Sequence, residues 1–511
     1  MSEATSAETE GVTRSRGLGR IVRNAVDLGS SQVLTLAVSA VVALLLPRFL
    51  GAEHLGKFAF ASAYTTYFLL ATNLGVTTHL TKELARDPGI AAAYTVNSLF
   101  LRLPLAVFAA LMGALLINLI GADTLTKQTI YILSVGMVLT TLYDILVASL
   151  QGLQKMRPIA ISQVLLKVSF GVSVTVLLLT GHGLLEVAIA SVASVIAGLI
   201  IPAIVLIRRL RFPEYRKVGI GIDPRVWKTL VLGGLPFLVW QASLVIYGKV
   251  DILMLGAFTT DEVIGWYAAA YRLTSLHVFI PAVVMTATLP ALVAAARDDR
   301  HSFNTITRRA LQVAIVGTLP IAVGTLLLAD KFIDVFNYPD EFSNSVPLVI
   351  ILALHSPLVA ADMIIGTALI ASDKQRRWAL TGVAAAVLNP SMNAVLIPLT
   401  ASMYDNGAIG AAVATLATEL FMMVMGLRLL PPGTLGVQSA RMAARAVASV
   451  AVMAAVVTLL RDAPIVVPVA AGAIVYGLSI FAFRAIQVDD VSRVFKHLRA
   501  DRRQLVADST A

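Results

Sequence analysis

Cysteine is absent from this 511-residue chain, and charged residues are scarce. Without cysteine the protein can form neither disulfides nor thiolate metal sites. Charged residues make up 14% of the chain and hydrophobic residues 58%, whereas a soluble globular protein is about a quarter charged. The mean hydropathy is correspondingly high, at +0.83. The composition excludes an ordinary soluble domain and indicates a protein that lies in a membrane.

The motifs of soluble enzymes are missing as well. The seven histidines are scattered, without HExxH or another paired ligand spacing, so we expect no metal site, no catalytic residue and no cofactor. The stretch from Gly51 to Phe58 has the spacing of a phosphate-binding loop, but it follows no predicted strand and lacks the Ser or Thr that holds magnesium. The sequence therefore predicts a protein that is not an enzyme, and any pumping must use a gradient or the imbalance of the substrate itself.

Long apolar runs recur from end to end, each of about 20 residues or more and long enough to cross a hydrocarbon core of about 30 Å. They predict an all-α polytopic membrane protein with about 14 transmembrane helices. The polar N-terminus lacks the short apolar core of a secretory signal. The predicted spans cover residues 26–47, 57–79, 91–120, 128–152, 158–180, 184–207, 229–257, 262–296, 308–330, 344–371, 377–400, 406–430, 440–460 and 464–484.

Lysine and arginine are distributed very unequally between the two sides of these spans. Of the 40, 31 fall in the terminal tails and alternate loops, 5 in the opposite loops and 4 within spans. Because basic loops remain in the cytoplasm, both termini are predicted to be cytoplasmic, in the plasma membrane. The same rule explains the net charge of +10, so we expect no nucleic-acid partner.

An internal repeat organises the chain. The stretch PRFLGAEHLGKFAFASAY at 47–64 returns in altered form as LGAFTTDEVIGWYAAAY at 255–271, and the alignment places Gly56 on Gly265. Such duplication is typical of transporters, whose substrate site lies at the repeat interface. Because six spans precede the basic loop after residue 207, the two halves share one orientation and are parallel repeats.

The repeat and the basic loop together divide the chain into six parts. They are a disordered cytoplasmic tail 1–16, an N-lobe 17–207 with spans one to six, a basic cytoplasmic linker 208–228, a C-lobe 229–430 with spans seven to twelve, two extra helices in 431–484, and a basic cytoplasmic tail 485–511, in which a short surface helix is expected.

Basic residues within the spans are the main candidates for a binding site. An ionisable group at membrane depth costs roughly 2.5–3.5 kcal/mol, so it usually faces a cavity or a partner. Arg272 lies about ten residues into span eight and Lys167 about nine residues into span five, which at helical rise is well inside the bilayer. Arg102 and Lys249 lie nearer the two membrane edges, where long side chains can snorkel.

Among the acidic residues within the spans, which also include Glu186 and Asp251, the main candidates are Asp144, Asp362 and Glu419. They could bind a coupling cation, or they could neutralise the basic residues in ion pairs. The sequence leaves both interpretations open.

Several of these segments resemble a known family. The stretch LPRFLGAEHLGKFAFASA, followed by TNLGVTTHLTKELAR at 72–86, resembles the opening of polysaccharide or lipid-linked oligosaccharide flippases, such as O-antigen flippases. These belong to the multidrug/oligosaccharidyl-lipid/polysaccharide exporter superfamily. The passage 388–419 looks like the family's eleventh and twelfth spans, in which an Asn-x-x-Leu-Ile-Pro end is followed by Gly-Ala-Ala-x-Ala-Thr.

The resemblance implies two six-helix lobes around a central cavity, plus two extra C-terminal helices. It implies export of an isoprenoid-diphosphate-linked oligosaccharide from the cytoplasmic to the outer leaflet by alternating access, for cell-surface glycan assembly. Arg272 matches a basic cavity residue in span eight of related lipid II flippases. The implied partners are the lipid-linked oligosaccharide and membrane lipid, with a glycan polymerase or glycosyltransferase as a candidate protein partner. Basic side chains would shield the diphosphate during crossing.

Two other functions are open. A cation-coupled multidrug extruder of the same superfamily would have an acidic, apolar cavity and usually twelve spans. A membrane scaffold, or an integral glycan polymerase or ligase, is the third class. The enzymes of that class would carry a large outer loop, whereas the longest one expected here, at 328–344, is short.

Overall fold

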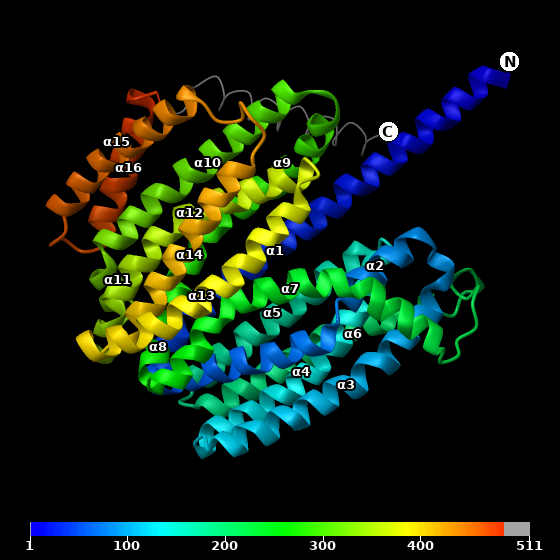
Figure 1. The fold of residues 1–511 in the computed structure, drawn as a ribbon, viewed down its shortest axis with the longest axis horizontal. Coiled ribbons are helices and arrows are strands. Elements are labelled where there is room, and N and C mark those ends of the chain that lie inside the picture. Colours follow the sequence, from blue (N-terminus) through cyan, green and yellow to red (C-terminus); the bar gives the residue numbers. More distant parts are fainter. Residues whose placement is uncertain (1, 485–511) are drawn as a thin grey trace. The chain divides into compact units, whose positions relative to one another are not determined.

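The computed structural model describes residues 2–484, which form helices joined by short connections, with no strand among them (Figure 1). Within this described part, 12 helical segments are long and apolar enough to cross a membrane. The predicted all-α, multi-pass membrane fold is therefore confirmed. The predicted basic tail 485–511 lies outside the described residues.

The first helix, α1 (Ser2–Asn73), shows why the predicted number of spans is only approximate. Its apolar part, Leu34–Asn73, has 40 residues, which at about 1.5 Å per residue is twice the length of one crossing. The helix breaks at Gly51, where φ is 72° and ψ 174°. The turn predicted between spans 26–47 and 57–79 is thus a single non-helical glycine. At the other end of the chain, α16 (Val466–Ala482) has only 17 residues.

The same helix also includes residues 2–16, for which the sequence predicts disorder. Proline, the strongest helix breaker, does not occur in α1 before Pro47. A continuous helical backbone from Ser2 onward therefore meets no steric obstacle.

The chain divides into two compact units, and the first comprises residues 1–269 and 386–408. In it α3 and α4 lie side by side, as do α5 and α6 (Figure 1). Its elements after α1 are α2 (Val76–Arg86), η1 (Pro88–Ile90), α3 (Ala91–Ile120), α4 (Thr124–Gly152), α5 (Met156–Leu179), α6 (Leu184–Arg209), η2 (Pro213–Tyr215), α7 (Pro224–Phe258), most of α8 (Asp261–Ser275) and the second half of α13 (Gln375–Tyr404).

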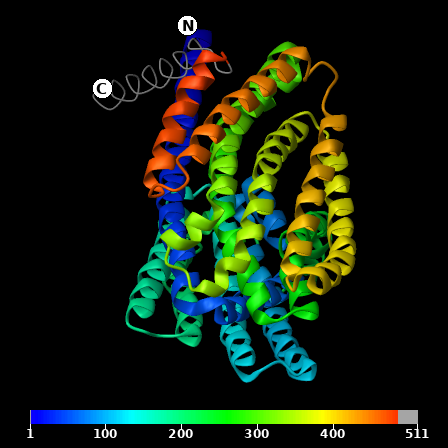
Figure 2. The same cartoon turned by 90° about the vertical axis from the view of Figure 1, so that its left-hand side faces the viewer.

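The second unit comprises residues 270–385 and, within the described part of the chain, 409–484. Its helices α15 and α16 form an antiparallel pair beside α10 (Figure 2). It contains the end of α8, η3 (Leu276–Val278), α9 (Phe279–Asp298), α10 (Arg300–Leu327), α11 (Ala329–Val335), η4 (Asp340–Ser345), α12 (Val346–Ala371), the first half of α13, nearly all of α14 (Gly407–Leu429), α15 (Val437–Leu459) and α16.

The first unit includes α7, although the sequence places this helix in the C-lobe. The reason is a close backbone approach between α7 and the end of α1. Gly75, with φ 68°, begins the turn into α2, and a Cβ there would lie 2.0 Å from the carbonyl oxygen of Gly234. The lobes 17–207 and 229–430 remain a prediction about the moving parts of a transporter, distinct from these packing units.

The two copies of the sequence repeat pack against each other within the first unit. A Cβ on Gly56 would lie 1.8 Å from the carbonyl oxygen of Asp261, and a Cβ on Gly265 would lie 1.9 Å from that of Ala52. The alignment that places Gly56 on Gly265 also places Ala52 on Asp261, so these two contacts are equivalent under the repeat. The glycines of the motif are required because backbone touches backbone there.

Lys57 lies beside this glycine contact and joins three carboxylates. It is 5% exposed, and its Nζ lies 2.8 Å from Asp261, 3.0 Å from Asp123 and 3.3 Å from Glu53. Asp123 is also the N-cap of α4, where it accepts hydrogen bonds from the backbone N–H groups of residues 125 and 126. The lysine of the false phosphate-binding motif therefore has a structural role.

Candidate functional site

Arg102, on α3, is the most deeply buried of the predicted basic residues, with no exposed surface. Its Nε donates a hydrogen bond to the carbonyl oxygen of Thr72 at 3.0 Å, next to the point where α1 ends. The two terminal guanidinium nitrogens have no hydrogen-bond partner among the described residues. Two unsatisfied charged donors at membrane depth are costly, and they are suited to an anionic group.

Asp144, on α4, is the charged residue that acts electrostatically on Arg102. It is half-buried and lines a polar pocket of about 340 Å³ in the first unit. The pocket lies where α1 ends and α2 begins, and α4 supplies its other wall. The other lining residues are mainly hydroxyl and amide side chains: Asn73, Thr77, Thr78, Thr81 and Gln151, together with Val147 and Ala148.

The other two basic candidates of the first unit are in different surroundings. Lys167 on α5 and Lys249 on α7 are both exposed. Of the four basic residues that the sequence singles out, Arg102 has a charged neighbour from the acidic set, Asp144. The assignment of all four to one substrate site remains a prediction.

Two residues after Lys249, Asp251 lies in a buried polar cluster whose other members the sequence did not indicate. Asp251, which is 4% exposed, accepts a hydrogen bond from Tyr267 Oη at 2.8 Å and another from Asn393 Nδ2 at 2.6 Å. Asn393 also donates to the side-chain oxygen of Asn389 at 2.8 Å, and both asparagines are fully buried. The side-chain oxygen of Asn393 has no hydrogen-bond partner among the described residues.

The chemistry of this Asp251 cluster suits a small hard cation or a proton. It brings one carboxylate, two amide oxygens and a phenol hydroxyl together, and hard cations prefer oxygen ligands. The cluster contains only one acidic residue, and no group of three or more acidic, histidine or cysteine residues that could hold a metal ion is found in the described part of the chain. A signal was present in the sequence, since two asparagines four residues apart share one face of an apolar helix.

In the second unit, Arg272 lies at the last turn of α8, just before the short η3 segment. It is half-buried, and Tyr338 acts on it electrostatically. Asp362 on α12 is 8% exposed, and neither of its carboxylate oxygens has a hydrogen-bond partner among the described residues. A buried carboxylate without a partner is costly, which makes Asp362 a candidate for binding a proton or a cation.

Glu419 on α14 has a histidine neighbour. Its Oε1 lies 3.5 Å from Nε2 of His355, and the carboxylate is 5% exposed. A second histidine of this unit, His277 in η3, is buried between the hydroxyls of Ser356, at 2.8 Å, and Thr325, at 3.2 Å. In the described part of the second unit, the carboxylates of Asp362 and Glu419 and the ring of His277 are thus buried, and His355 is half-buried.

The fold is similar to that of several solved structures. The chain is similar to a lipid II flippase, MurJ, in an inward closed conformation, with a TM-score of 0.66 and 16% identity over 90% of this chain and 98% of the other. It is also similar to a multidrug resistance MATE family transporter of the MOP superfamily, with a TM-score of 0.58 and 17% identity over 79% of this chain and 98% of the other. These likenesses show that the chain shares the fold of these proteins.

The family follows from the sequence itself. The family model described as polysaccharide biosynthesis protein matches residues 21–295, which is more than half of the chain. This protein belongs to the polysaccharide biosynthesis protein family, and the resemblance drawn from the sequence motifs is confirmed. A second family model, MatE, matches residues 236–395.

Two curated relatives come from Haloferax volcanii. The chain is 28% identical over 241 residues to a probable flippase, AglR, and 25% identical over 170 residues to a probable low-salt glycan biosynthesis flippase. The first alignment covers 45% of this chain and 49% of the relative, and the second covers 33% and 34%. The chain thus spans about half or less of the length of the curated relatives that it matches.

Proposed function

We propose that this protein is a flippase that moves an isoprenoid-diphosphate-linked oligosaccharide from the cytoplasmic to the outer leaflet, for cell-surface glycan assembly. The observation that carries the proposal is Arg102, a buried cation with two unsatisfied terminal donors in a membrane protein of the polysaccharide biosynthesis family. The flippase relatives support the same reading. The protein acts as a transporter and carries out no covalent chemistry on its substrate.

Within this proposal, the guanidinium of Arg102 exchanges partners during transport. In the present structure its charged neighbour is Asp144, on the wall of the polar pocket. A diphosphate offers stronger, bidentate acceptors than a single carboxylate. Substrate binding would therefore draw Arg102 away from Asp144, while Lys167, Lys249 and Arg272 supply further positive charge along the path.

The energy source in this proposal is an ion gradient. The Asp251 cluster supplies oxygen ligands for a monovalent cation in the first unit, and Asp362 supplies an unpartnered carboxylate in the second. Asp144, Asp362 and Glu419 then have different tasks: Asp144 balances Arg102, whereas Asp362 and Glu419 bind ions or protons. In this proposal Asp144 neutralises a basic residue, whereas Asp362 and Glu419 bind the coupling ion.

The membrane in question is the plasma membrane, with both termini in the cytoplasm, as the distribution of basic residues indicates. The two lobes would rock about the cavity expected from the family. The lipid tail would remain in the bilayer while the glycan passes, and a glycan polymerase or glycosyltransferase would use the product on the outer face.

The MatE family match favours a second candidate, a cation-coupled multidrug extruder. Complementation of a strain that lacks its glycan flippase separates the two, scored by surface glycan and by accumulated lipid-linked precursor. Rescue by the wild type and loss of rescue in an equally expressed Arg272→Ala variant would support the flippase and its basic site. Failure of the wild type, together with increased drug resistance, would support the extruder.

A further inference from the structure

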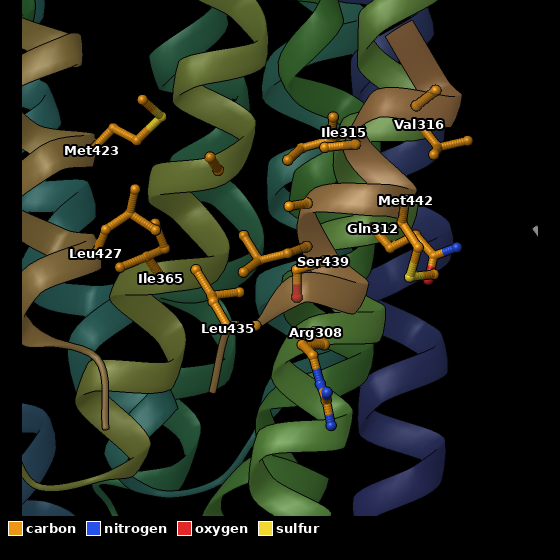
Figure 3. A pocket seen from close by; sticks show the side chains of 16 residues that line it. Arg308, Gln312, Ile315, Val316, Ile365, Met423, Leu427, Leu435, Ser439 and Met442 are labelled. Atoms are coloured by element: carbon orange, nitrogen blue, oxygen red, sulfur yellow. The ribbon is translucent and has the colours of Figure 1, made fainter. Parts of the chain in front are cut away.

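The second unit contains an apolar groove with a volume of about 370 Å³. It lies between α10, α12, α14 and α15, and Figure 3 shows Met423 and Leu427 on one wall and Ile315 and Val316 at one end. At the opposite end, the side chain of Arg308 points away from the apolar wall (Figure 3). The groove is thus lined mainly by apolar side chains, with a basic residue at one end.

A strongly basic pocket of about 330 Å³ adjoins this groove. The two share Arg308, Gln312 and Met442, so they form one continuous depression. No aspartate or glutamate lines the basic pocket in the part of the chain that the structure describes. Its arginines come from the start of α10, the start of α15 and the residues after α16: Arg308, Arg309, Arg441, Arg445 and Arg484.

One of these arginines forms a hydrogen bond to a backbone carbonyl oxygen, which carries no formal charge. Arg445 donates to the carbonyl oxygen of Arg484 at 3.2 Å, which leaves two cationic side chains close together. On the border of the groove, the buried hydroxyl of Ser439 has no hydrogen-bond partner among the described residues. Clustered guanidinium groups beside an unsatisfied hydroxyl fit an oxyanion with several acceptor oxygens.

We propose that this depression binds an anionic membrane phospholipid, with its phosphate among the arginines and an acyl chain in the apolar groove. Charge complementarity selects an anion, and the adjoining apolar groove selects a lipid over a free phosphate. The loop charges place this end of α10 and α15 on the cytoplasmic side, where basic pockets between helices recognise anionic headgroups. The lipid would join α15 to the rest of the second unit.

This inference goes beyond the proposed function, because the depression shares no residue with the substrate candidates Arg102, Lys167, Lys249 and Arg272. The lipid site is tested by lipid binding, and no transport measurement enters the test. Failure of the flippase proposal would therefore leave the lipid site intact, and the reverse also holds.

The test is lipid binding to the purified, delipidated full-length protein by native mass spectrometry. Phosphatidylglycerol is titrated against zwitterionic phosphatidylcholine. Each arginine near a headgroup contributes roughly fivefold to affinity, so the double variant Arg441→Ala/Arg445→Ala is expected to bind phosphatidylglycerol about 25-fold more weakly. The matched control is Arg376→Ala/Arg377→Ala, which removes two exposed arginines of the same unit outside the depression and is expected to bind normally.

A charge-neutral pair of variants tests the groove independently of the arginines. Ala443 lines the groove, whereas the adjacent Ala444, which is also exposed on α15, does not. Ala443→Phe is expected to weaken binding of phosphatidylglycerol, and Ala444→Phe is expected to leave it unchanged.

Equal affinity of the wild type and Arg441→Ala/Arg445→Ala for phosphatidylglycerol would overturn the proposal. So would equal affinity of the wild type for the two phospholipids. A polyprenyl diphosphate that displaces phosphatidylglycerol at equal concentration would identify the depression as part of the substrate path, and would also overturn it.

Discussion

Gly265→Ala should destabilise the first unit, because the added methyl group has no space. Its Cβ would lie 1.9 Å from the carbonyl oxygen of Ala52 and 2.6 Å from the carbonyl carbon, whereas ordinary contact begins at 3.4 Å. Both atoms are backbone, so no side-chain rotation can relieve the overlap. The two segments of the repeat must therefore separate by about 1.5 Å, the difference between 3.4 and 1.9 Å.

The expected cost combines two opposing effects. Overpacking of this kind costs up to about 3 kcal/mol, while replacing glycine by alanine in a helix returns roughly 1 kcal/mol of helix propensity. The net loss in unfolding free energy is about 2 kcal/mol. A separation of this size would also stretch the 2.8 Å hydrogen bond from Lys57 to Asp261 beyond bonding range, which adds to the loss.

Thermal unfolding of the detergent-solubilised protein measures this effect, with Gly248→Ala as the matched control. Gly248 lies inside α7, and a Cβ there meets nothing within 4 Å, so that variant should unfold at or above the wild-type temperature. Gly56→Ala should resemble Gly265→Ala, and the double variant should cost less than the sum because both open the same contact. If Gly265→Ala unfolds no earlier than Gly248→Ala, the backbone contact between the repeats is wrong.

Three further outcomes are expected. Arg102→Leu should lower the free energy of unfolding by about 3 kcal/mol, because it leaves the carboxylate of Asp144 without its charged partner. The same substitution should cost much less in an Asp144→Asn background. A double-mutant cycle by thermal unfolding measures this coupling, and additive effects of the two substitutions would contradict the pairing. Asp251→Asn should lower the free energy of unfolding by about 2 kcal/mol, because Asn393 loses the carboxylate oxygen that accepts its hydrogen bond. It should also abolish any stabilisation of the protein by sodium relative to choline. Stabilisation by sodium that persists in this variant would place the cation elsewhere. Asp299 caps α10, and its pKa lies below the usual value because the hydroxyl and backbone N–H of Ser302 donate to it. Its stabilising effect is therefore present above the ordinary pKa of aspartate and is lost as the pH falls through the lowered pKa. The melting temperature of the wild type should exceed that of Asp299→Ala at neutral pH, and this difference should vanish at low pH. The melting temperature of Asp299→Asn should exceed that of Asp299→Ala at both pH values.

The membrane class of the fold could be predicted because long apolar runs admit few alternatives. The repeat was also visible, since glycines fixed by backbone contact leave a pattern such as Gly56 and Gly265. The break in α1 was harder to predict. A polar stretch between two apolar runs usually indicates a loop, but here helix geometry persists on both sides of Gly51 and only that residue departs. Packing between α7 and the end of α1, which depends on Gly75 and Gly234, lies beyond any local pattern.

Part of the candidate site could also be predicted from the sequence, and part could not. Hydropathy shows which ionisable residues lie at membrane depth, so Arg102, Asp144 and Asp362 were identifiable. It does not show which way a side chain points, and Lys167 proves exposed while Arg102 is fully buried. The Asp251 cluster was missed because asparagine carries no charge, and its partners come from helices far apart in the sequence.

The most direct test of the account is the flipping rate in proteoliposomes that contain a polyprenyl-diphosphate-linked oligosaccharide with a reporter on its glycan. Transfer is scored by the accessibility of the glycan to a membrane-impermeant reagent. The wild type should exchange the lipid between leaflets well above protein-free vesicles, and Arg102→Leu that remains folded and reconstituted should fall to the background rate. Wild-type vesicles that exchange no faster than empty ones, in the presence and absence of a sodium or proton gradient, would contradict the flippase proposal.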